Sequence, residues 1–388
     1  GFQIKTDLAS SNASGGSFVY MAFAENPGND FEVNNMTASV GVTTASSGFD
    51  ALTYSGTGAS QSISSLAFSP GLLWIKERDT DGYHHKLVDS VRGSTRTLRS
   101  SSSGQEFTNT NQVTSFNADG FSLGADNSFP GDLECNQSGK NYVAWAWKAG
   151  DSTSSNTDGT ITSEVSVSQD YGFSIVSYTG TNSAGSVGHG LNSAPSFWIQ
   201  KARSQSTDNW SIYHSDLGPD EYLKFTSDAS TSSSGFWGAG PTSSVMNLSA
   251  GNYINDQSVT YIAYCWTEKP KFSKFGVYKG NASDTGSIVT TGFKPEFVLI
   301  KGTSASRDWW MYDSARDSIN PNMARLSPNS SGKEATNVYA IDFLDNGFQL
   351  KTSDVALNGS ENYVYAAFAG DFTSSDGDSF VDTPEQRS

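Results

Sequence analysis

The amino-acid sequence predicts an all-β protein built from tandem antiparallel β-sandwich modules. Two observations carry this prediction. Sequence landmarks recur at nearly constant spacing along the 388 residues, and the recurring segments are short, aromatic and β-branched, with Gly, Asn, Asp or Ser at their ends. Composition agrees, because only 16% of the residues are charged while 23 Phe, 16 Tyr and 9 Trp supply apolar area that suits sheets better than helical bundles.

The motif that ends each module occurs four times. Its copies are residues 18–24 (FVYMAFA), 142–148 (YVAWAWK), 261–266 (YIAYCW) and 363–369 (YVYAAFA). A Gly-Phe dipeptide precedes every copy, and in the first and last copies it begins the matching strings GFQIKT and GFQLKT. Four ending motifs predict four modules or parts of modules.

An opening motif occurs only three times, at residues 52–56 (LTYSG), 176–180 (VSYTG) and 276–280 (GVYKG). Between the two motifs, a Pro is followed by an apolar residue at the second position and by Lys at the sixth, beginning at Pro70, Pro195 and Pro295. These landmarks predict three complete modules and one remnant.

The boundaries follow from these landmarks. Residues 28–150, 151–268 and 269–372 are expected to be three β-sandwich repeats, called repeats 1, 2 and 3 below. Residues 1–27 would be the last strands of a preceding repeat, which complete a module or pair with a neighbour's open edge, and residues 373–388 a linker to a further domain. Because roughly 100 residues suffice for a core, we expect independent globules arranged like beads, with the opening and ending strands of each lying close together.

Charge and cysteine content exclude several classes of function. Since 24 basic residues face 40 acidic ones, the net charge of −16 opposes binding to nucleic acid or anionic lipid. No apolar run approaches the roughly 20 residues that span a bilayer, so no membrane insertion is expected. Cys135 and Cys265 are too few for a disulfide framework or a zinc site, and we expect both to be free thiols.

Motifs that resemble catalytic or metal sites each occur in one repeat only. Ser122, in GFSLG at residues 120–124, matches a nucleophile elbow, and the carboxylates of Glu77, Asp79 and Asp81 are spaced like those of a glycosidase. Neither pattern is shared by the other repeats, so we expect a strand and a solvated turn, and no enzyme. The His84-His85 pair lacks supporting ligands. No cofactor is expected, with Ca²⁺ at the acidic turns 79–82 or 376–378 left open as an alternative.

Aromatic side chains are the candidate ligand contacts, because exposed rings stack on the C–H faces of sugars. The candidates for glycan binding are Trp210, Tyr213, Trp237, Trp309, Trp310, Tyr312 and Tyr83. Most of them lie on strands whose successive side chains point to opposite faces, so one set is expected to be core. Packing is the alternative interpretation for every one of these rings.

The landmarks together resemble a repeat of tail-fibre and virion structural proteins of marine tailed bacteriophages. The resemblance rests on Pro-x-apolar-x-x-x-Lys, on Asp-Ser-x-Arg at residues 89–92 and 313–316, and on Tyr-Val-Ala-Trp-x-Trp-Lys-Ala-Gly at residues 142–150. It implies jelly-roll sandwiches of the concanavalin or lectin-like type and a location on the virion. Repeat 2 departs from the pattern with HSDL at residues 214–217, and the pairs Asp89/Arg92 and Asp313/Arg316 are expected to be local salt bridges.

Three functions remain as hypotheses. The leading one is a virion-associated fibre, expected to be a homo-oligomer held by other virion proteins, whose repeated modules adhere weakly to host-surface glycans and gain avidity from repetition. The second is a purely structural capsid or tail decoration, because no polar cluster is shared by all three repeats. The third is a polysaccharide depolymerase, which rests only on Glu77, Asp79 and Asp81.

Overall fold

The protein is all-β. The computed structural model describes residues 48–125, 135–206, 208–251, 253–336 and 339–370. These residues form 26 β-strands and no α-helix, and all paired strands are antiparallel. The predicted fold class is confirmed at this level, and no helix in the described ranges is long and apolar enough to cross a membrane. The predicted remnant 1–27 and linker 373–388 lie outside the described residues.

The strands are numbered in chain order. Those before residue 150 are β1 (Phe49–Ser55), β2 (Gln61–Ile63), β3 (Leu72–Glu77), β4 (Lys86–Asp89), β5 (Arg96–Thr97), β6 (Phe107–Thr108), β7 (Val113–Asn117), β8 (Gly120–Leu123) and β9 (Asn141–Trp147). Repeat 2 contains β10 (Ser154–Asn156), β11 (Ser163–Ser168), β12 (Phe173–Thr179), β13 (Gly185–Gly188), β14 (Phe197–Ala202), β15 (Ser211–His214), β16 (Glu221–Lys224), β17 (Thr231–Ser232), β18 (Val245–Leu248) and β19 (Thr260–Trp266). Repeat 3 contains β20 (Ser273–Lys279), β21 (Ile288–Thr290), β22 (Phe297–Gly302), β23 (Trp309–Asp313), β24 (Ala340–Leu344), β25 (Gly347–Lys351) and β26 (Asn362–Phe368).

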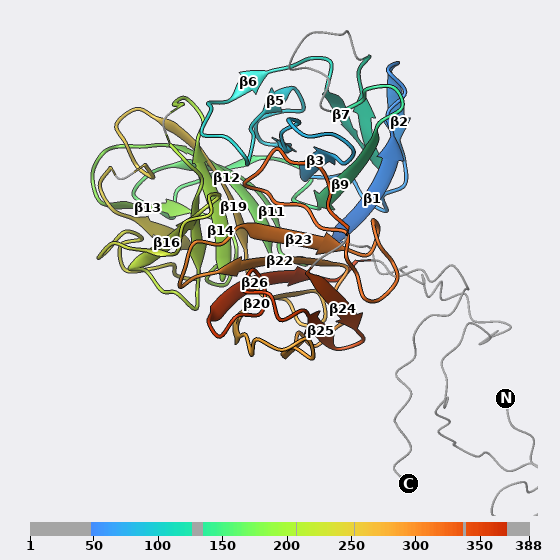
Figure 1. Cartoon of the computed structure of the whole chain (residues 1–388). Helices are drawn as coiled ribbons and strands as arrows, with labels where there is room; N and C mark the ends of the chain where they lie inside the picture. The colour runs from blue at the N-terminus through green and yellow to red at the C-terminus, as the bar shows by residue number, and fades with distance from the viewer. Residues whose placement is uncertain (1–47, 126–134, 207, 252, 337–338, 371–388) are drawn as a thin grey trace, which may run out of the picture. The chain divides into compact units, whose positions relative to one another are not determined.

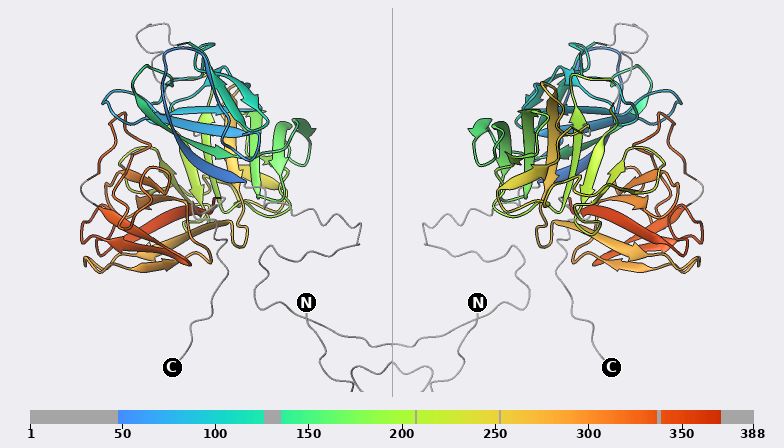
Figure 2. Two further views of the ribbon diagram at one scale, coloured as in Figure 1. Left: turned by 90° about the vertical axis from the view of Figure 1, so that its right-hand side faces the viewer. Right: turned by 90° about the vertical axis from the view of Figure 1, so that its left-hand side faces the viewer.

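Each repeat forms one main sheet and one smaller sheet, and repeat 1 has in addition the two-stranded sheet β5-β6 (Figures 1 and 2). The main sheets have the orders β1-β9-β3-β4 and β20-β26-β22-β23 in repeats 1 and 3, and repeat 2 extends the same arrangement to β10-β11-β12-β19-β14-β15-β16-β17. The smaller sheets are β2-β8-β7, β13-β18 and β21-β25-β24. The opening and ending strands are therefore neighbours in every repeat, as predicted.

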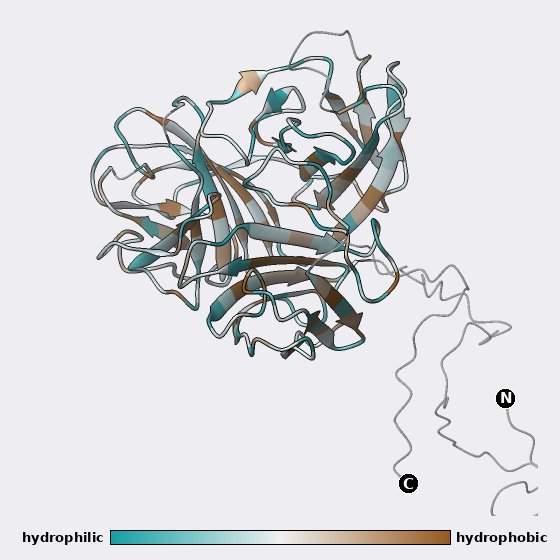
Figure 3. Ribbon diagram, in the orientation of Figure 1, coloured by the Kyte–Doolittle hydropathy of each residue, from teal (hydrophilic) through white to brown (hydrophobic). Residues whose placement is uncertain are grey.

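The ending strand shows why a continuous apolar run recurs. Along β9, Ala144 and Ala146 face the smaller sheet of repeat 1 and join its core. Trp145 and Trp147 point to the opposite face, where they are also buried. A strand that is buried on both faces is apolar at successive positions, and the hydrophobic colour accordingly runs along β22 and β26 in Figure 3.

The second faces of the three main sheets meet in one shared core. The last aromatic residues of the three ending strands are Trp147, Trp266 and Phe368. The ring centroid of Trp147 lies 5.8 Å from that of Trp266 and 5.6 Å from that of Phe368, and the centroids of Trp266 and Phe368 lie 6.0 Å apart. Elsewhere in this core, Phe225 of repeat 2 packs on Trp74 of repeat 1 and on Trp309 of repeat 3. The described residues consequently form one compact unit.

The expected row of independent globules must be corrected. Each main sheet has a second apolar face, and a lone module would expose that face to water. Burying it requires the other two repeats. Only the three smaller cores, each between a main sheet and its smaller sheet, belong to single repeats.

Three seams join the repeats into a closed ring. The same backbone hydrogen bond crosses each seam: the N–H of Glu106 to the carbonyl oxygen of Arg203 (2.8 Å), of Ser230 to Thr303 (3.0 Å), and of Glu334 to Arg78 (2.9 Å). These bonds connect repeat 1 to repeat 2, repeat 2 to repeat 3, and repeat 3 back to repeat 1. The arrangement has pseudo-threefold symmetry because equivalent positions make equivalent contacts.

Ion pairs reinforce two of the seams. Between repeats 3 and 1, the Glu334 carboxylate accepts hydrogen bonds from Arg78 at 2.8 and 2.9 Å and from Arg316 at 3.0 Å. Arg316 also pairs with Asp313 at 2.5 Å, which confirms the local salt bridge predicted from Asp-Ser-x-Arg. The equivalent network between repeats 1 and 2 consists of Asp89, Arg92, Glu106 and Arg203.

The seam between repeats 2 and 3 has replaced the whole network. At this seam His214 replaces the aspartate, and Leu217 replaces the arginine three residues later. Ser230 replaces the glutamate, and Thr303 replaces the second arginine across the seam. The change at residues 214–217 is therefore one part of a concerted replacement, which also removes both ionic partners across the seam. Both acidic and both basic positions of the network have changed together, so the replacement removes its charges in balanced pairs.

Side chains cover the free edges of two main sheets. The N–H of Ala51 in edge strand β1 donates to the carboxylate of Glu296 from repeat 3 (2.9 Å), and an N–H of edge strand β20 donates to Glu268 (3.3 Å). In repeat 2, the corresponding edge of the opening strand β12 pairs with strand β11 instead of a side chain. Burial, together with the nearby Asp50, raises the pKa of Glu296 well above its ordinary value. Such caps oppose edge-to-edge pairing with other chains.

The lysine of the central landmark is buried in every repeat. Burial lowers the pKa of Lys76, Lys201 and Lys301 to about 8 in each case. The Nζ of Lys201 donates to the carbonyl oxygen of Ser103 in repeat 1 (3.1 Å), and that of Lys301 reaches Ser227 in repeat 2 (3.4 Å). In these two repeats the landmark lysine serves a seam, which gives its recurrence a structural reason.

Candidate functional site

Five of the seven rings predicted to bind a glycan are buried. Trp210, Tyr213, Trp237, Trp309 and Tyr312 are at most 5% exposed. Two of them belong to the shared core and three to the smaller cores. A buried ring offers no face to a sugar, so the prediction is corrected for these five. Tyr213, Trp309 and Tyr312 lie on strands, whereas Trp210 and Trp237 lie outside them, and packing accounts for all five.

The other two rings are partly buried. Trp310 packs against the guanidinium group of Arg325, 4.9 Å from its ring centroid, and against the ring of Tyr339. The hydroxyl of Tyr83 donates to the side chain of Gln137 at 3.0 Å. Neither ring lines the groove described below, and for Trp310 and Tyr83 glycan contact stays a prediction.

The three carboxylates considered for catalysis each accept backbone N–H groups. Glu77 is buried, and its two oxygens accept the backbone N–H groups of residues 79 and 80 at 3.0 and 2.9 Å. Asp79 accepts the N–H of Asn141 at 2.8 Å, and Asp81 accepts the N–H of Lys333 at 2.9 Å. Because each carboxylate is engaged with the main chain, the geometry favours a turn over a pair of catalytic acids.

The remaining candidates also have structural surroundings. Ser122 lies inside β8, where its hydroxyl is 3.0 Å from that of Ser62, and no strand-to-helix turn surrounds it. Burial lowers the pKa of His85. Cys135 and Cys265 are buried and form no disulfide. Within the described ranges no three His, Cys, Asp or Glu side chains are grouped to hold a metal, and the acidic turn 376–378 lies outside those ranges.

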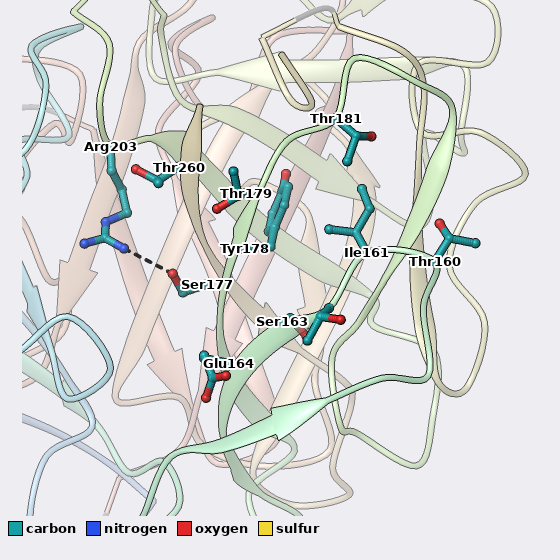
Figure 4. A pocket seen from close by; sticks show the side chains of 11 residues that line it. Thr160, Ile161, Ser163, Glu164, Ser177, Tyr178, Thr179, Thr181, Arg203 and Thr260 are labelled. Atoms are coloured by element: carbon teal, nitrogen blue, oxygen red, sulfur yellow. Dashed lines mark hydrogen bonds between the residues drawn. The ribbon is translucent and has the colours of Figure 1, made fainter. Parts of the chain in front are cut away.

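A groove of about 510 Å³ crosses repeat 2 beside its seam with repeat 1 (Figure 4). This volume lies within the usual range for small-molecule sites. Seven of its eleven lining residues are Ser or Thr: Thr160, Thr162, Ser163, Ser177, Thr179, Thr181 and Thr260. The others are Ile161, Glu164, Tyr178 and Arg203. The hydroxyl groups of these Ser and Thr residues give the groove hydrogen-bonding atoms that suit a hydroxylated ligand.

The groove exists because repeat 2 has the additional strand β11. This strand pairs with β12, which places Glu164 opposite Ser177. Just before β11, Ile161 bridges to Val187 of the smaller sheet, and its N–H donates to the carbonyl oxygen of Ser186 at 2.9 Å. Residues 154–168 thus close one side of repeat 2 and form a wall of the groove. In the described parts of repeats 1 and 3 no strand takes this place.

One arginine organises the charged part of the groove. The Nη1 of Arg203 donates to the hydroxyl of Ser177 at 3.1 Å, while Nε and Nη2 donate to Glu106 at 2.9 and 3.1 Å. Burial alone would raise the pKa of Glu106, but hydrogen bonds from Arg203 and Arg92 hold it below its ordinary value. The charge of the Arg203 guanidinium group is therefore balanced by Glu106 at the seam. The exposed Glu164 is the remaining charge in the groove. An anionic ligand is disfavoured.

Sequence reasoning missed this groove. Ser and Thr are abundant throughout the chain, so seven of them on one wall leave no motif. The available signal is the length of the connection between the ending strand of one repeat and the opening strand of the next. Between β9 and β12 this connection has 25 residues (148–172), whereas between β19 and β20 it has six (267–272). That excess contains the strand that builds the groove.

The comparisons with known proteins find one family. A model described as a domain of unknown function (DUF7483) matches residues 44–371. No curated protein and no solved structure matches the chain. The matched segment spans all three repeats, so the unit that the family describes is the whole ring and not a single repeat.

Proposed function

The chain belongs to the DUF7483 family of domains of unknown function, and we propose that it is a non-enzymatic fibre or appendage protein of a virion that adheres to host-surface glycans. The hydroxyl-lined groove of repeat 2 is the observation that carries the adhesive part. The virion setting rests on the resemblance of the repeat landmarks to tail-fibre proteins of marine tailed bacteriophages. A concanavalin-like, jelly-roll connection of the strands belongs to the same proposal.

The chemistry of the groove supports a sugar ligand. Thr and Ser hydroxyls both donate and accept hydrogen bonds, which matches the hydroxyl groups of a sugar. Arg203 and Ser177 are already joined by a hydrogen bond, so this part of the wall is ordered before any ligand arrives. Preorganisation lowers the entropy lost on binding. The open, polar lining is consistent with weak binding at a single site.

The number of grooves on each chain determines whether avidity can come from the repeats of one chain or from several chains. Within the described residues the groove is found in repeat 2, because it depends on β11 and the described parts of repeats 1 and 3 have no equivalent strand. Avidity then has to come from several copies of the chain on one particle. We therefore propose a homo-oligomer attached to other virion proteins.

A glycan array tests this proposal with one variant and one control. Thr179→Val should reduce retention of the bound glycan about three- to tenfold, because it removes one hydrogen-bonding hydroxyl from the groove. Ser55→Val changes the equivalent exposed position of repeat 1 and should leave retention unchanged. Retention of no glycan by the multimeric protein at any concentration would contradict adhesion.

A purely structural decoration of the capsid or tail is the alternative. It is favoured by the closed ring itself, whose landmarks all serve packing and seams, and by the carboxylate caps on two sheet edges. Locating the protein on the particle and removing it separates the two functions. Loss of adsorption to host cells with intact particles supports adhesion, and unchanged adsorption with less stable particles supports decoration.

A further inference from the structure

We propose that Glu106 of repeat 1 determines which ligands the groove of repeat 2 accepts: by neutralising Arg203 it makes the groove selective for uncharged ligands that carry hydroxyl groups. This inference rests on the proposed function and deepens it, because it names the residue that sets the ligand class. Glu106 itself is not among the residues that line the groove. It acts through Arg203, so it is a positioning residue that one repeat supplies to the site of another.

Arg203 is held from both sides of the seam. Its backbone N–H donates to the carbonyl oxygen of Thr260 in β19 (2.7 Å), and its own carbonyl oxygen accepts the N–H of Glu106 (2.8 Å). The guanidinium group donates from Nε and Nη2 to the two carboxylate oxygens of Glu106, at 2.9 and 3.1 Å. Such two-point pairs fix the orientation of a guanidinium group. The side chain of Arg203 is therefore placed by a residue of the neighbouring repeat.

Arg203 reaches the groove through Nη1. Figure 4 shows this nitrogen bonded to the Ser177 hydroxyl, at 3.1 Å. That hydroxyl donates in turn to the carbonyl oxygen of Tyr261 at 3.2 Å. A guanidinium group has five N–H donors, and three of those of Arg203 are engaged with Glu106 and Ser177. Within the described residues the other two have no protein partner, so they can donate to a ligand hydroxyl.

The charges around Arg203 are balanced. Glu106 also accepts a hydrogen bond from the buried Arg92 at 3.1 Å, but Arg92 has an acid of its own in Asp89. Two acids therefore face two arginines. Burial alone would raise the pKa of Glu106, but hydrogen bonds from Arg203 and Arg92 lower it, so the carboxylate is ionised near neutral pH. An anion in the groove would consequently meet a guanidinium group whose charge is already compensated.

The seam between repeats 3 and 1 provides a control within the same molecule. There Arg78 donates from Nε and Nη2 to Glu334, at 2.9 and 2.8 Å, as Arg203 does to Glu106. Neither Arg78 nor Glu334 lines the groove. A change at Glu334 therefore reproduces the effect on a seam without the effect on the groove.

Sulfate titration of the full chain tests the inference without any glycan. Glu106→Gln keeps the size of the side chain but removes its charge, so the guanidinium group of Arg203 becomes available to an anion. With the NMR signal of the Arg203 Nε–H as the readout, sulfate should bind the variant about tenfold or more tightly than the unmodified chain. Glu106→Ser copies the serine found at this position of the seam between repeats 2 and 3, and should give the same result.

Three further variants are the controls for this titration. Glu164→Gln removes the exposed acid of the groove but leaves Arg203 bound to Glu106, and Glu334→Gln removes the matching acid of the other seam. Neither should bind sulfate at Arg203. Glu106→Asp keeps the charge and should behave like the unmodified chain. Sulfate binding that is no tighter in Glu106→Gln and Glu106→Ser than in these controls would overturn the inference.

A glycan array separates this inference from the proposed function. Neutral oligosaccharides are printed beside their carboxylated counterparts. Glu106→Gln should raise the ratio of carboxylated to neutral glycan retained about tenfold or more, whereas Glu334→Gln should leave the ratio unchanged. An unchanged ratio in a Glu106→Gln protein that still retains glycan overturns the inference alone. Retention of no glycan by any of these proteins overturns the proposed function, while the sulfate titration still reports on Glu106.

Discussion

Replacing Trp147 by Ala should lower the free energy of unfolding of the whole unit by about 3–5 kcal/mol. Trp147 is 2% exposed, and its ring contacts those of Trp266 and Phe368, which belong to the other two repeats. The cavity would therefore open where all three repeats meet. Urea denaturation followed by tryptophan fluorescence and by circular dichroism measures the loss, and both signals should shift together.

Trp310→Ala is the matched control for this experiment. Trp310 is partly buried and packs against the smaller core of repeat 3, away from the shared core. Its loss should cost clearly less than the loss of Trp147. Equal losses, or a Trp147→Ala protein in which only repeat 1 unfolds, would show that the central aromatic rings do not couple the repeats.

Glu334→Ala should destabilise the unit by about 3–5 kcal/mol, because it breaks a largely buried ion network at the seam that closes the ring. The Glu334 carboxylate is held by Arg78 and Arg316, and the side chain of Arg316 is fully buried. Its removal leaves Arg78 without its partner across the seam and Arg316 with Asp313 alone. Thermal and urea denaturation of the variant measure the effect.

The control for the seam is an exposed ion pair. Lys274 and Glu268 form one at 2.9 Å with both side chains more than a third exposed. Lys274→Ala should therefore change the stability by less than about 1 kcal/mol. If Glu334→Ala proves equally mild, the network does not stabilise the ring. The seam between repeats 2 and 3, which has Ser230 and Thr303 in place of two partners, shows that a seam can form without it.

The strands were predictable because their landmarks are local in the sequence. The tyrosines of the opening and ending motifs recur since they stack in pairs, as Tyr178 does on Tyr261 with centroids 5.0 Å apart. The local pair of Asp313 and Arg316 was likewise predictable from its spacing. Such contacts depend on residues at fixed distances along the chain or in adjacent strands.

The ring was not predicted, although its signal is present. Successive apolar residues in the ending motif, such as Trp145, Ala146 and Trp147, indicate a strand buried on both faces. A two-sheet module buries only one face of each sheet, so the second apolar face already required a partner. The sequence does not say that this partner is the rest of the same chain, because the Arg78–Glu334 contact joins residues 256 positions apart.

Five of the seven rings chosen as glycan contacts are buried, for a physical reason. Rings such as Trp210 and Trp309 were chosen because they are large, yet large rings in a protein with three small cores and one shared core are the packing material. The residues proposed for binding are instead small hydroxyl side chains, whose types carry no signal in a chain rich in Ser and Thr.

Calorimetry of the unmodified chain tests most directly whether the three repeats form one cooperative ring. Because the repeats share a core and the seams close on one another, the described unit should unfold in a single transition whose calorimetric and van't Hoff enthalpies agree. Two or three separable transitions, each with the enthalpy expected of about 100 residues, would show independent modules and would contradict the closed ring.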